Sequence, residues 1–262
     1  MADAPAAPEA KGLPTIDVNE YGGKKEGVKQ SMNRRLFMQL LVFRCPRGTE
    51  PVSSGAKSAP DAIGAELVQR LRERKIPGVV YSDTMDPRSL GLLTWGEDPA
   101  RFVREVRPLF TEAPLNHVEL RDDYAMIGRT YGTGHEPDLE WVLLKRPIEN
   151  VTNEAWRWHV WYPLRRKGAF AKLEPIDQSH ILREHAALGI AYGQADLATD
   201  VRLACHGLDA EDNEFVIGLV GKDLHPLSHL VQAMRKTRQT SEFIEKMGPF
   251  FVGYVLGTSS GT

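Results

Sequence analysis

The pattern of hydrophobic and polar positions predicts two successive units with the same order of elements. In the first unit, short hydrophobic runs indicate strands, and longer stretches with hydrophobic residues at helical spacing indicate helices. The second helix starts at Asp98, an N-cap residue that precedes Pro99. Strands are predicted at 36–43, 78–81, 90–94 and 115–127, and helices at 62–74 and from 98 onward.

The second unit repeats the order strand, helix, strand, strand, helix, strand. Strands are predicted at 157–164, 201–205, 215–220 and 250–256, and helices at 177–192 and from 223 onward. Each unit resembles a ferredoxin-like βαββαβ motif, and neither unit could easily cover its own sheet. We therefore predict an α+β fold in which duplicated ferredoxin-like units pack their sheets together as a barrel.

The remaining segments set the predicted domain boundaries. Residues 1–32 are rich in Ala, Pro, Gly and Lys and show no sustained hydrophobic period, which predicts a flexible N-terminal extension. Residues 33–128 form the first half and residues 154–262 the second half. The connection at 129–153 is long, and long connections are often functional.

Composition narrows the class of protein. The chain has 262 residues and a formal net charge of -2, which argues against a general electrostatic surface for nucleic acid. Cys45 and Cys205 have no C-x-x-C spacing, so neither a disulfide framework nor a thiolate zinc site is expected. No secretory signal and no hydrophobic run of membrane-spanning length is found, and we expect a cytoplasmic protein without a membrane or nucleic-acid partner.

One histidine lies on the hydrophobic side of a predicted helix. His185 follows Ile181 and precedes Leu188 at helical spacing within the helix at 177–192. A buried imidazole needs a partner. The pattern allows two interpretations, a core histidine bonded to a backbone carbonyl or an axial ligand of a cofactor iron.

The segment WRWHVWYPLRRK at 156–167 combines aromatic rings with three successive cations. Tyr162 stands in the predicted strand, and Arg165, Arg166 and Lys167 follow it. A guanidinium group matches the geometry of a carboxylate, so the run could hold an anionic ligand, although a basic surface turn would look the same. His225 and His229 also have helical spacing, but without a third ligand they indicate a metal site only weakly.

Four segments resemble the chlorite dismutase superfamily of haem proteins, which includes the coproheme decarboxylases. They are WYPLRRKGAF, ILREHAALGIAYG, CHGLDAEDNEFVIGLVGKD and MRKTRQTSEFIEKMGPFFVG, which begin at 161, 181, 205 and 234. The resemblance is close over 155–256 and rests mainly on element order in the first half. It implies a duplicated ferredoxin-like barrel, assembly as a homopentamer, and haem b or coproheme bound in the C-terminal half.

The resemblance also implies roles for single residues. His185 matches the proximal ligand of the haem iron in an E-H-x-x-x-G-x-x-Y setting. Tyr162 matches the tyrosine that relays an oxidising equivalent to a porphyrin propionate, and Arg166 the basic residue that grips or protonates around that propionate. Leu164 stands where methionine is usual. Further cofactor contacts are predicted at Leu164, Arg165 and Lys167.

Two positions depart from the family pattern. Chlorite-splitting members carry a distal arginine, and the matching position here is Ala198 or Asp200. Arg202 shares strand parity with both, so it is our candidate for the distal catalytic residue. The acidic partner of the proximal histidine is also missing, with Gln239 or Thr240 at its place, and a neutral partner would make the imidazole less electron-donating.

These features favour peroxide-dependent oxidative decarboxylation of iron coproporphyrin III, coproheme, to haem b in haem biosynthesis. The alternatives are chlorite dismutation to chloride and dioxygen, a haem carrier or sensor without turnover, and a barrel that binds no haem.

Overall fold

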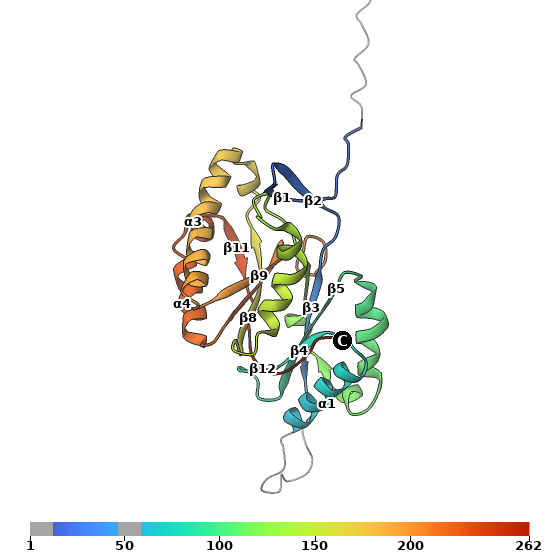
Figure 1. Ribbon diagram of the computed structural model, residues 1–262. Coiled ribbons are helices and arrows are strands. Elements are labelled where there is room, and N and C mark those ends of the chain that lie inside the picture. Colours follow the sequence, from blue (N-terminus) through green and yellow to red (C-terminus); the bar gives the residue numbers. More distant parts are fainter. Residues whose placement is uncertain (1–12, 47–58, 262) are drawn as a thin grey trace, which may run out of the picture.

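The strands of the two units close into a single barrel. The computed structural model describes residues 13–46 and 59–261 (Figure 1). The first unit contributes β3 (Phe37–Arg44), β4 (Gly78–Asp83), β5 (Ser89–Gly96) and β7 (Met126–Arg129). The second contributes β8 (Trp158–Arg166), β9 (Thr199–Ala204), β10 (Phe215–Gly221) and β12 (Phe251–Ser259).

Both units use the same strand order. The first is arranged β7-β3-β5-β4 and the second β12-β8-β10-β9, so each places its fourth strand beside its first, then its third and its second. All of these pairings are antiparallel. Two seams join the units, β12 with β4 and β7 with β9, the latter through Arg129 and Ala204. The fold confirms the predicted duplicated α+β barrel.

Alternate side chains of each strand point into the barrel or outward to the helices. Inward residues from both units, with Trp161 and Tyr81 among the largest, form one buried cluster. Hydrophobic residues of the connection join that cluster and cover it. They are Leu139, Leu143, Leu144 and Val151, from the π-helical turn Trp141–Lys145, α2 (Arg146–Thr152) and the residues before them. The outward residues of the two sheets belong to separate clusters.

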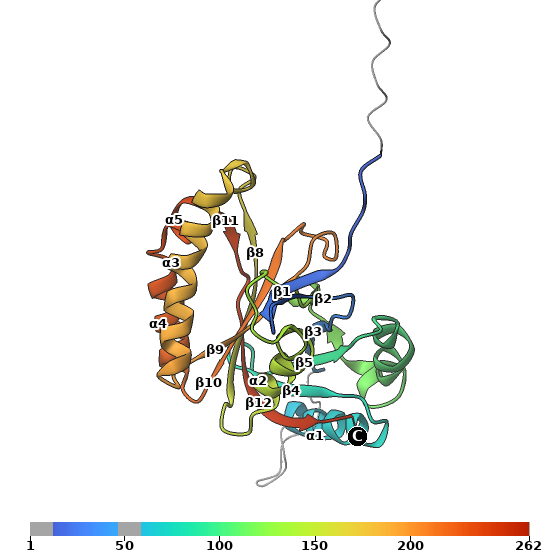
Figure 2. The same cartoon turned by 45° about the horizontal axis from the view of Figure 1, so that its top comes forward.

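The helix layers of the two units differ in how tightly they pack. In the first unit α1 (Ala59–Glu73) buries Ile63, Leu67, Val68 and Leu71. The corresponding helix of the second unit, α3 (Pro175–Gln194), buries only Ile181 and exposes Leu182 and Ile190 by 40% and 59%. In Figure 2, α3 lies with α4 (Leu224–Met234) and α5 (Arg238–Phe243) outside the barrel on one side. The outward face of the second sheet is therefore packed mainly by residues of α4 and the loop before β12, and less by α3.

Three stretches differ from the sequence-based expectation. The strand predicted at 115–127 is only β7, because polar residues interrupt the segment before it, which forms 3-10 turns and the short β6 (Glu119–Leu120). The second helix of the first unit is a π-helical turn, Phe102–Val106, followed by the 3-10 turn Arg107–Thr111. Strand β11 (Ile244–Met247) precedes β12 and extends the pairing with β8.

Part of the predicted extension has defined structure. Strands β1 (Glu20–Lys25) and β2 (Val28–Met32) form a hairpin, whereas no element was predicted there. The hairpin is bonded to the connection, with Gly23 N and Gln30 Nε2 both donating to Glu136 O. In the described ranges, no helix is both long enough and hydrophobic enough to cross a membrane.

Candidate functional site

The site is built on the outward face of the second sheet. Strand register aligns Arg202 of β9, Ile217 of β10 and Tyr162 of β8 in one row. The neighbouring rows contribute Leu219 and Leu164 to the same face. The result is a hydrophobic surface with a phenol at one end of its central row and a guanidinium group at the other.

Tyr162 presents an unbonded hydroxyl group on this face. The residue is 6% exposed, and its ring stacks on Phe250 with 4.5 Å between the ring centroids. Within the described residues the hydroxyl makes no hydrogen bond. Burial raises the pKa of Tyr162, so the phenol is protonated at neutral pH.

Arg202 belongs to a group of three charges. Its Nε lies 3.4 Å from the Asp200 carboxylate, which also pairs with Arg146 of α2. Burial acts to raise the pKa of Asp200, but the two guanidinium groups outweigh it and lower the pKa. Asp200 is therefore an anion between two cations. The Arg202 side chain remains 38% exposed and can still meet a ligand.

His185 faces this sheet from α3, and a threonine fixes its tautomer. The Nδ1 atom of His185 lies 3.3 Å from Thr237 Oγ1, whose hydroxyl donates to Met234 O at 2.8 Å. The hydroxyl then accepts from Nδ1–H, which leaves the lone pair on Nε2. Burial lowers the pKa of His185 and keeps the ring neutral, the form that binds metal ions.

The partner of His185 differs from the one expected from sequence. It is Thr237, and not Gln239 or Thr240, because the turn between α4 and α5 carries Thr237 toward α3. Thr240 Oγ1 lies 3.4 Å from Thr237 Oγ1, and Gln239 Oε1 is buried without a hydrogen-bond donor. The partner is nevertheless neutral, as the sequence indicated.

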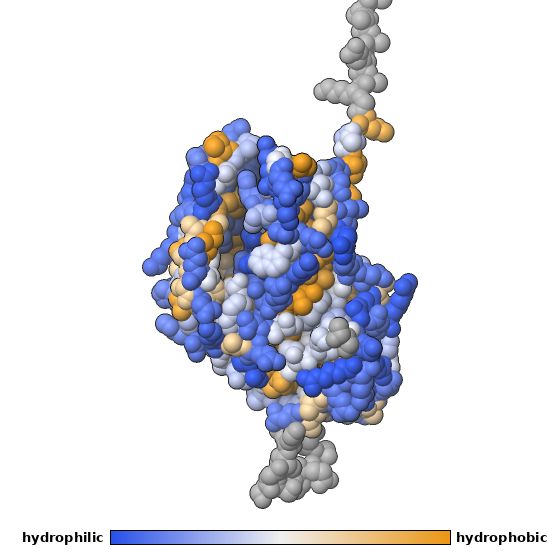
Figure 3. Space-filling view, viewed as in Figure 1, coloured by the Kyte–Doolittle hydropathy of each residue, from blue (hydrophilic) through white to orange (hydrophobic). Residues whose placement is uncertain are grey.

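A hollow lies beside α3, on the side toward the strands of the second sheet (Figure 1 and Figure 3). Burial lowers the pKa of His185, and the charges of Asp200 and Arg202 make smaller, opposing contributions to it. Ile181 is the one fully buried side chain of α3, while Tyr192 packs partly buried against the outward cluster of the second sheet. Figure 3 shows the molecular surface hollowed beside the ridge that carries α3.

Arg166 lies on the same face and is held along one edge. Its Nε donates to Glu214 Oε2 at 2.9 Å, and the guanidinium group lies over the rings of Phe170 and Phe215 at 4.6 and 4.7 Å. No described residue bonds its terminal nitrogens. This edge is thus available to a carboxylate.

Two other predicted contacts are not brought into this group. Arg165 points to the opposite side of β8, since strand residues alternate, and its Nη1 donates to Glu211 O at 3.3 Å. Lys167 donates to Glu242 O at 2.8 Å. Leu164, by contrast, is buried on the same face as Tyr162.

Sequence analysis missed one aromatic residue of the site. Tyr131 follows β7 in the connection, and its ring centroid lies 5.5 Å from that of Phe215. Burial raises its pKa, and the charges of Arg202 and Arg166 act on its phenol. Its position depends on how the two units join, which no local spacing reveals. The length of the connection was the only available signal.

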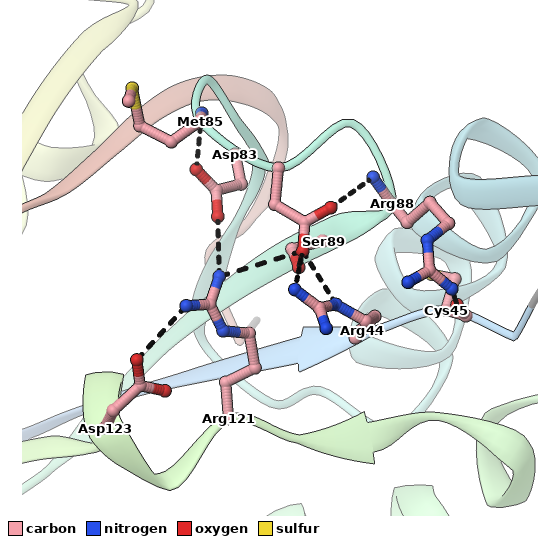
Figure 4. Close-up of polar contacts among 9 residues, drawn as sticks. Arg44, Cys45, Asp83, Met85, Arg88, Ser89, Arg121 and Asp123 are labelled. Atoms are coloured by element: carbon pink, nitrogen blue, oxygen red, sulfur yellow. Dashed lines mark hydrogen bonds and ion pairs between the residues drawn. The ribbon is translucent and has the colours of Figure 1, made fainter.

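Two other groups of polar side chains form ion pairs or hydrogen bonds with each other. Figure 4 shows Arg121 between Asp83 and Asp123, with nitrogen to oxygen distances of 3.7 and 3.1 Å. His229 pairs with the Tyr192 hydroxyl. Over residues 13–46 and 59–261, no group of three His, Cys, Asp or Glu residues could hold a metal ion, which removes support for a metal site at His225 and His229.

Comparison with known proteins finds one family that matches part of the chain. The family model described as chlorite dismutase matches residues 145–256, the part that carries Tyr162, His185 and Arg202. The match covers the end of the connection and most of the second unit, so this part of the chain is similar to chlorite dismutases. None of the curated proteins is significantly similar in sequence.

Solved structures of chlorite dismutases and of a haem-binding protein share the fold. A candidate chlorite dismutase has a TM-score of 0.65 at 14% identity, with 85% of this chain and 95% of that chain covered. The chlorite dismutase of Candidatus Nitrospira defluvii in complex with imidazole has a TM-score of 0.64 at 12% identity, covering 86% and 93%. A haem-binding protein of Thermus thermophilus has a TM-score of 0.63 at 15% identity, covering 93% and 94%.

The residues of this face fit a haem group. One side of the space offers the free Nε2 of a neutral histidine, and the other a hydrophobic sheet surface formed by Leu164, Ile217 and Leu219. Arg166 and Arg202 supply cations at its edges. A flat hydrophobic macrocycle with carboxylate arms matches this arrangement of groups.

Proposed function

We propose that the protein binds an iron porphyrin through His185 and uses hydrogen peroxide to decarboxylate coproheme to haem b. The observation that carries the proposal is the free phenol of Tyr162, which lies in one row with Arg202 on the face toward His185. The resemblance to the coproheme decarboxylases gives this phenol a task beside the porphyrin iron. A carrier needs no such phenol.

The chain's own residues have distinct roles in this proposal. The bound iron porphyrin, with peroxide, supplies the oxidising power. Tyr162 would donate an electron and its phenolic proton to the oxidant, and would then regain an electron and a proton from the propionate. Arg166 binds a propionate through its free edge. Each propionate that becomes a vinyl group loses carbon dioxide, one proton and an electron pair. The electron pair and two protons, one of them from the solvent, reduce one hydrogen peroxide molecule to two water molecules.

Replacement of Tyr162 tests the proposal directly. We expect Tyr162→Phe to bind coproheme with a Soret band like that of the wild type, because the phenylalanine ring still stacks on Phe250. Porphyrin mass, followed by chromatography and mass spectrometry during a peroxide titration, should stay at that of coproheme. The matched control is Tyr254→Phe, a tyrosine 37% exposed on β12, which should retain turnover. Unchanged turnover in Tyr162→Phe would remove the assignment.

Chlorite dismutation is the second candidate, and the position of Arg202 favours it. A cation opposite the histidine ligand could bind the chlorite anion. The Asp200 carboxylate 3.4 Å away opposes this, since it already neutralises that cation. Rapid release of dioxygen from chlorite without bleaching of the haem, and its loss in Arg202→Gln, would establish this reaction instead.

The haem-binding neighbour supports a third possibility, a carrier without turnover. Its mark would be reversible haem binding with the porphyrin mass unchanged by peroxide, which the same titration measures. A homopentamer and a cytoplasmic location remain predictions. Light scattering of the purified protein tests the first.

A further inference from the structure

A tyrosine and a histidine form an isolated pair inside the barrel. Tyr81 of β4 and His159 of β8 are both 0% exposed. The Tyr81 hydroxyl oxygen lies 2.8 Å from His159 Nδ1. Neither residue lies on the outward face that carries the proposed haem site, so the proposed reaction gives the pair no task.

The hydrogen bonds fix the direction of the proton. His159 Nε2 lies 3.1 Å from Trp156 O, and a carbonyl oxygen can only accept, so Nε2 carries the hydrogen. The Nδ1 atom therefore accepts from the Tyr81 hydroxyl. Burial lowers the pKa of His159 to about 3, so the ring is neutral and its lone pair is available.

This geometry suits the loss of an electron from Tyr81. A neutral phenol becomes strongly acidic when it gives up an electron, and in a dry interior its proton cannot leave to water. A base already within hydrogen-bond distance can take the proton in the same step. His159 Nδ1 is such a base.

Aromatic rings connect the pair with the proposed haem face. Trp161 points inward next to outward-pointing Tyr162, and its indole N–H is buried without an acceptor. Trp161 and Tyr81 belong to the same buried cluster inside the barrel. Phe251, the register partner of Trp161, lies 5.8 Å from Tyr81 between ring centroids. The barrel wall thus carries aromatic rings on both faces at this level.

We propose that Tyr81 is a redox-active tyrosine that is oxidised by one electron when an oxidant forms between α3 and the sheet. One electron leaves Tyr81 through Trp161 and Tyr162 to a one-electron oxidant formed there by haem and peroxide. The phenolic proton moves to His159 Nδ1, so the products are a neutral phenoxyl radical, an imidazolium and the oxidant reduced by one electron. The inference rests on haem binding at His185 but not on decarboxylation.

The test uses the full chain loaded with haem b, with the Soret band confirming that the haem is bound. Peroxide is added, samples are freeze-quenched, and electron paramagnetic resonance is recorded with ring-deuterated tyrosine to identify tyrosyl signals. We expect a tyrosyl radical in the wild type and its loss in Tyr81→Phe. Tyr192→Phe is the matched control, because Tyr192 is bonded to His229 outside the barrel. The signal should persist in it.

If Tyr81→Phe does not fold, a measurement on the wild type can still test the inference. With ¹⁵N-labelled histidine, the radical should show coupling to an imidazole nitrogen that survives in Tyr192→Phe. A radical lost in Tyr162→Phe or Tyr192→Phe but unchanged in Tyr81→Phe would overturn the inference, as would absence of imidazole coupling. Absence of a Soret band would overturn haem binding and this inference together. A Tyr81 radical with haem b, together with no mass loss from coproheme in the separate peroxide titration, would overturn only the proposed decarboxylation.

Discussion

The hydroxyl of Thr237 determines which nitrogen of His185 is free. It accepts from Nδ1–H because its own hydrogen is donated to Met234 O. A carboxylate at this place would push electron density into the ring, whereas a hydroxyl group only orients it. The chain therefore combines a well-oriented imidazole with weak electron donation from its partner.

Removal of that hydroxyl should weaken haem binding. We expect Thr237→Val to lower haem affinity by roughly tenfold, since the buried Nδ1–H loses its acceptor and the ring its orientation. Thr237→Ser retains the hydroxyl and should bind like the wild type. Titration of haem followed at the Soret band gives both affinities. Equal affinity in Thr237→Val would mean that Thr237 does not position His185.

A second residue-scale prediction concerns the wall beneath the site. A Cβ atom at Gly218 would lie 2.6 Å from the Trp161 ring, and that ring is enclosed by the barrel. Gly218→Ala should lower the free energy of unfolding by about 1 to 3 kcal/mol. Gly168→Ala, where a Cβ atom meets nothing within 4 Å, is the control for urea unfolding. Equal stability of the two variants would contradict this packing.

Single residues also show how far sequence could lead. Helical spacing singled out His185, and strand parity placed Asp200 and Arg202 on one face, because both depend on neighbours within one element. Thr237 and Tyr131 were not predicted, because a turn places Thr237 at the site and the connection between the units places Tyr131 there. Arg165 was included for its charge, although strand alternation turns it away.

At the scale of elements, a polar network fastens one end of the first unit. Asp86 receives hydrogen bonds from the Arg88 N–H, the Arg44 guanidinium and the Ser89 hydroxyl, and Arg121 lies 3.8 Å away. Burial acts to raise the pKa of Asp86, but these bonds lower it to about 2. The network ties β3, the turn between β4 and β5, and the segment after β6 (Figure 4).

The lowered pKa predicts how stability depends on pH. Asp86 stabilises the fold above its ordinary pKa, and the contribution is lost as pH falls toward about 2. Asp86→Asn should cost about 2 kcal/mol at pH 7, and the difference from wild type should shrink below pH of about 4. Urea unfolding across this range measures it.

The control for this prediction is an exposed ion pair. Glu105→Gln breaks a pair with Arg101 whose side chains are 44% and 28% exposed, and should change stability by less than about 1 kcal/mol at any pH. A gap between Asp86→Asn and wild type that stays constant down to pH of about 2.5 would contradict the assignment of this shift.

Element order was predictable because short hydrophobic runs alternate with helical stretches in both units. The predicted strand at 115–127 was wrong because its hydrophobic residues are separated by polar ones, which favour turns over a continuous ladder. The hairpin of β1 and β2 could not be read from hydrophobic pattern. Backbone pairing, such as that of Glu20 with Met32, sets its register, and bonds from Gly23 and the Gln30 side chain hold it to the connection.

At the scale of the whole molecule, the two units share a strand order but not a helix layer. Because α3 buries only Ile181, it should open more readily than α1 without a bound ligand. We expect amides of α3 to exchange hydrogen faster than those of α1 in the haem-free protein. Haem should slow α3 selectively, and at a hundredfold excess over Kd stabilise the fold by about 2.7 kcal/mol.

Hydrogen exchange with mass spectrometry, with and without haem, makes this comparison. His185→Ala removes the axial ligand, so its α3 should remain fast after haem is added. Equal protection of α1 and α3 without haem would show that α3 is packed like its counterpart.

Because the two units pack differently, different requirements limit substitutions in them: folding in the first unit and ligand binding in the second. Under α1, a substitution that changes side-chain volume affects the stability of the fold, because the residues there form a packed cluster. Under α3, the same substitution meets open space and is judged by the ligand that enters it. In a saturation library sorted for folded protein, we expect far more substitutions to be retained at Ile217 than at Leu92 of β5. When the retained variants are then sorted for haem binding, we expect a larger fraction to be lost at Ile217 than at Leu92.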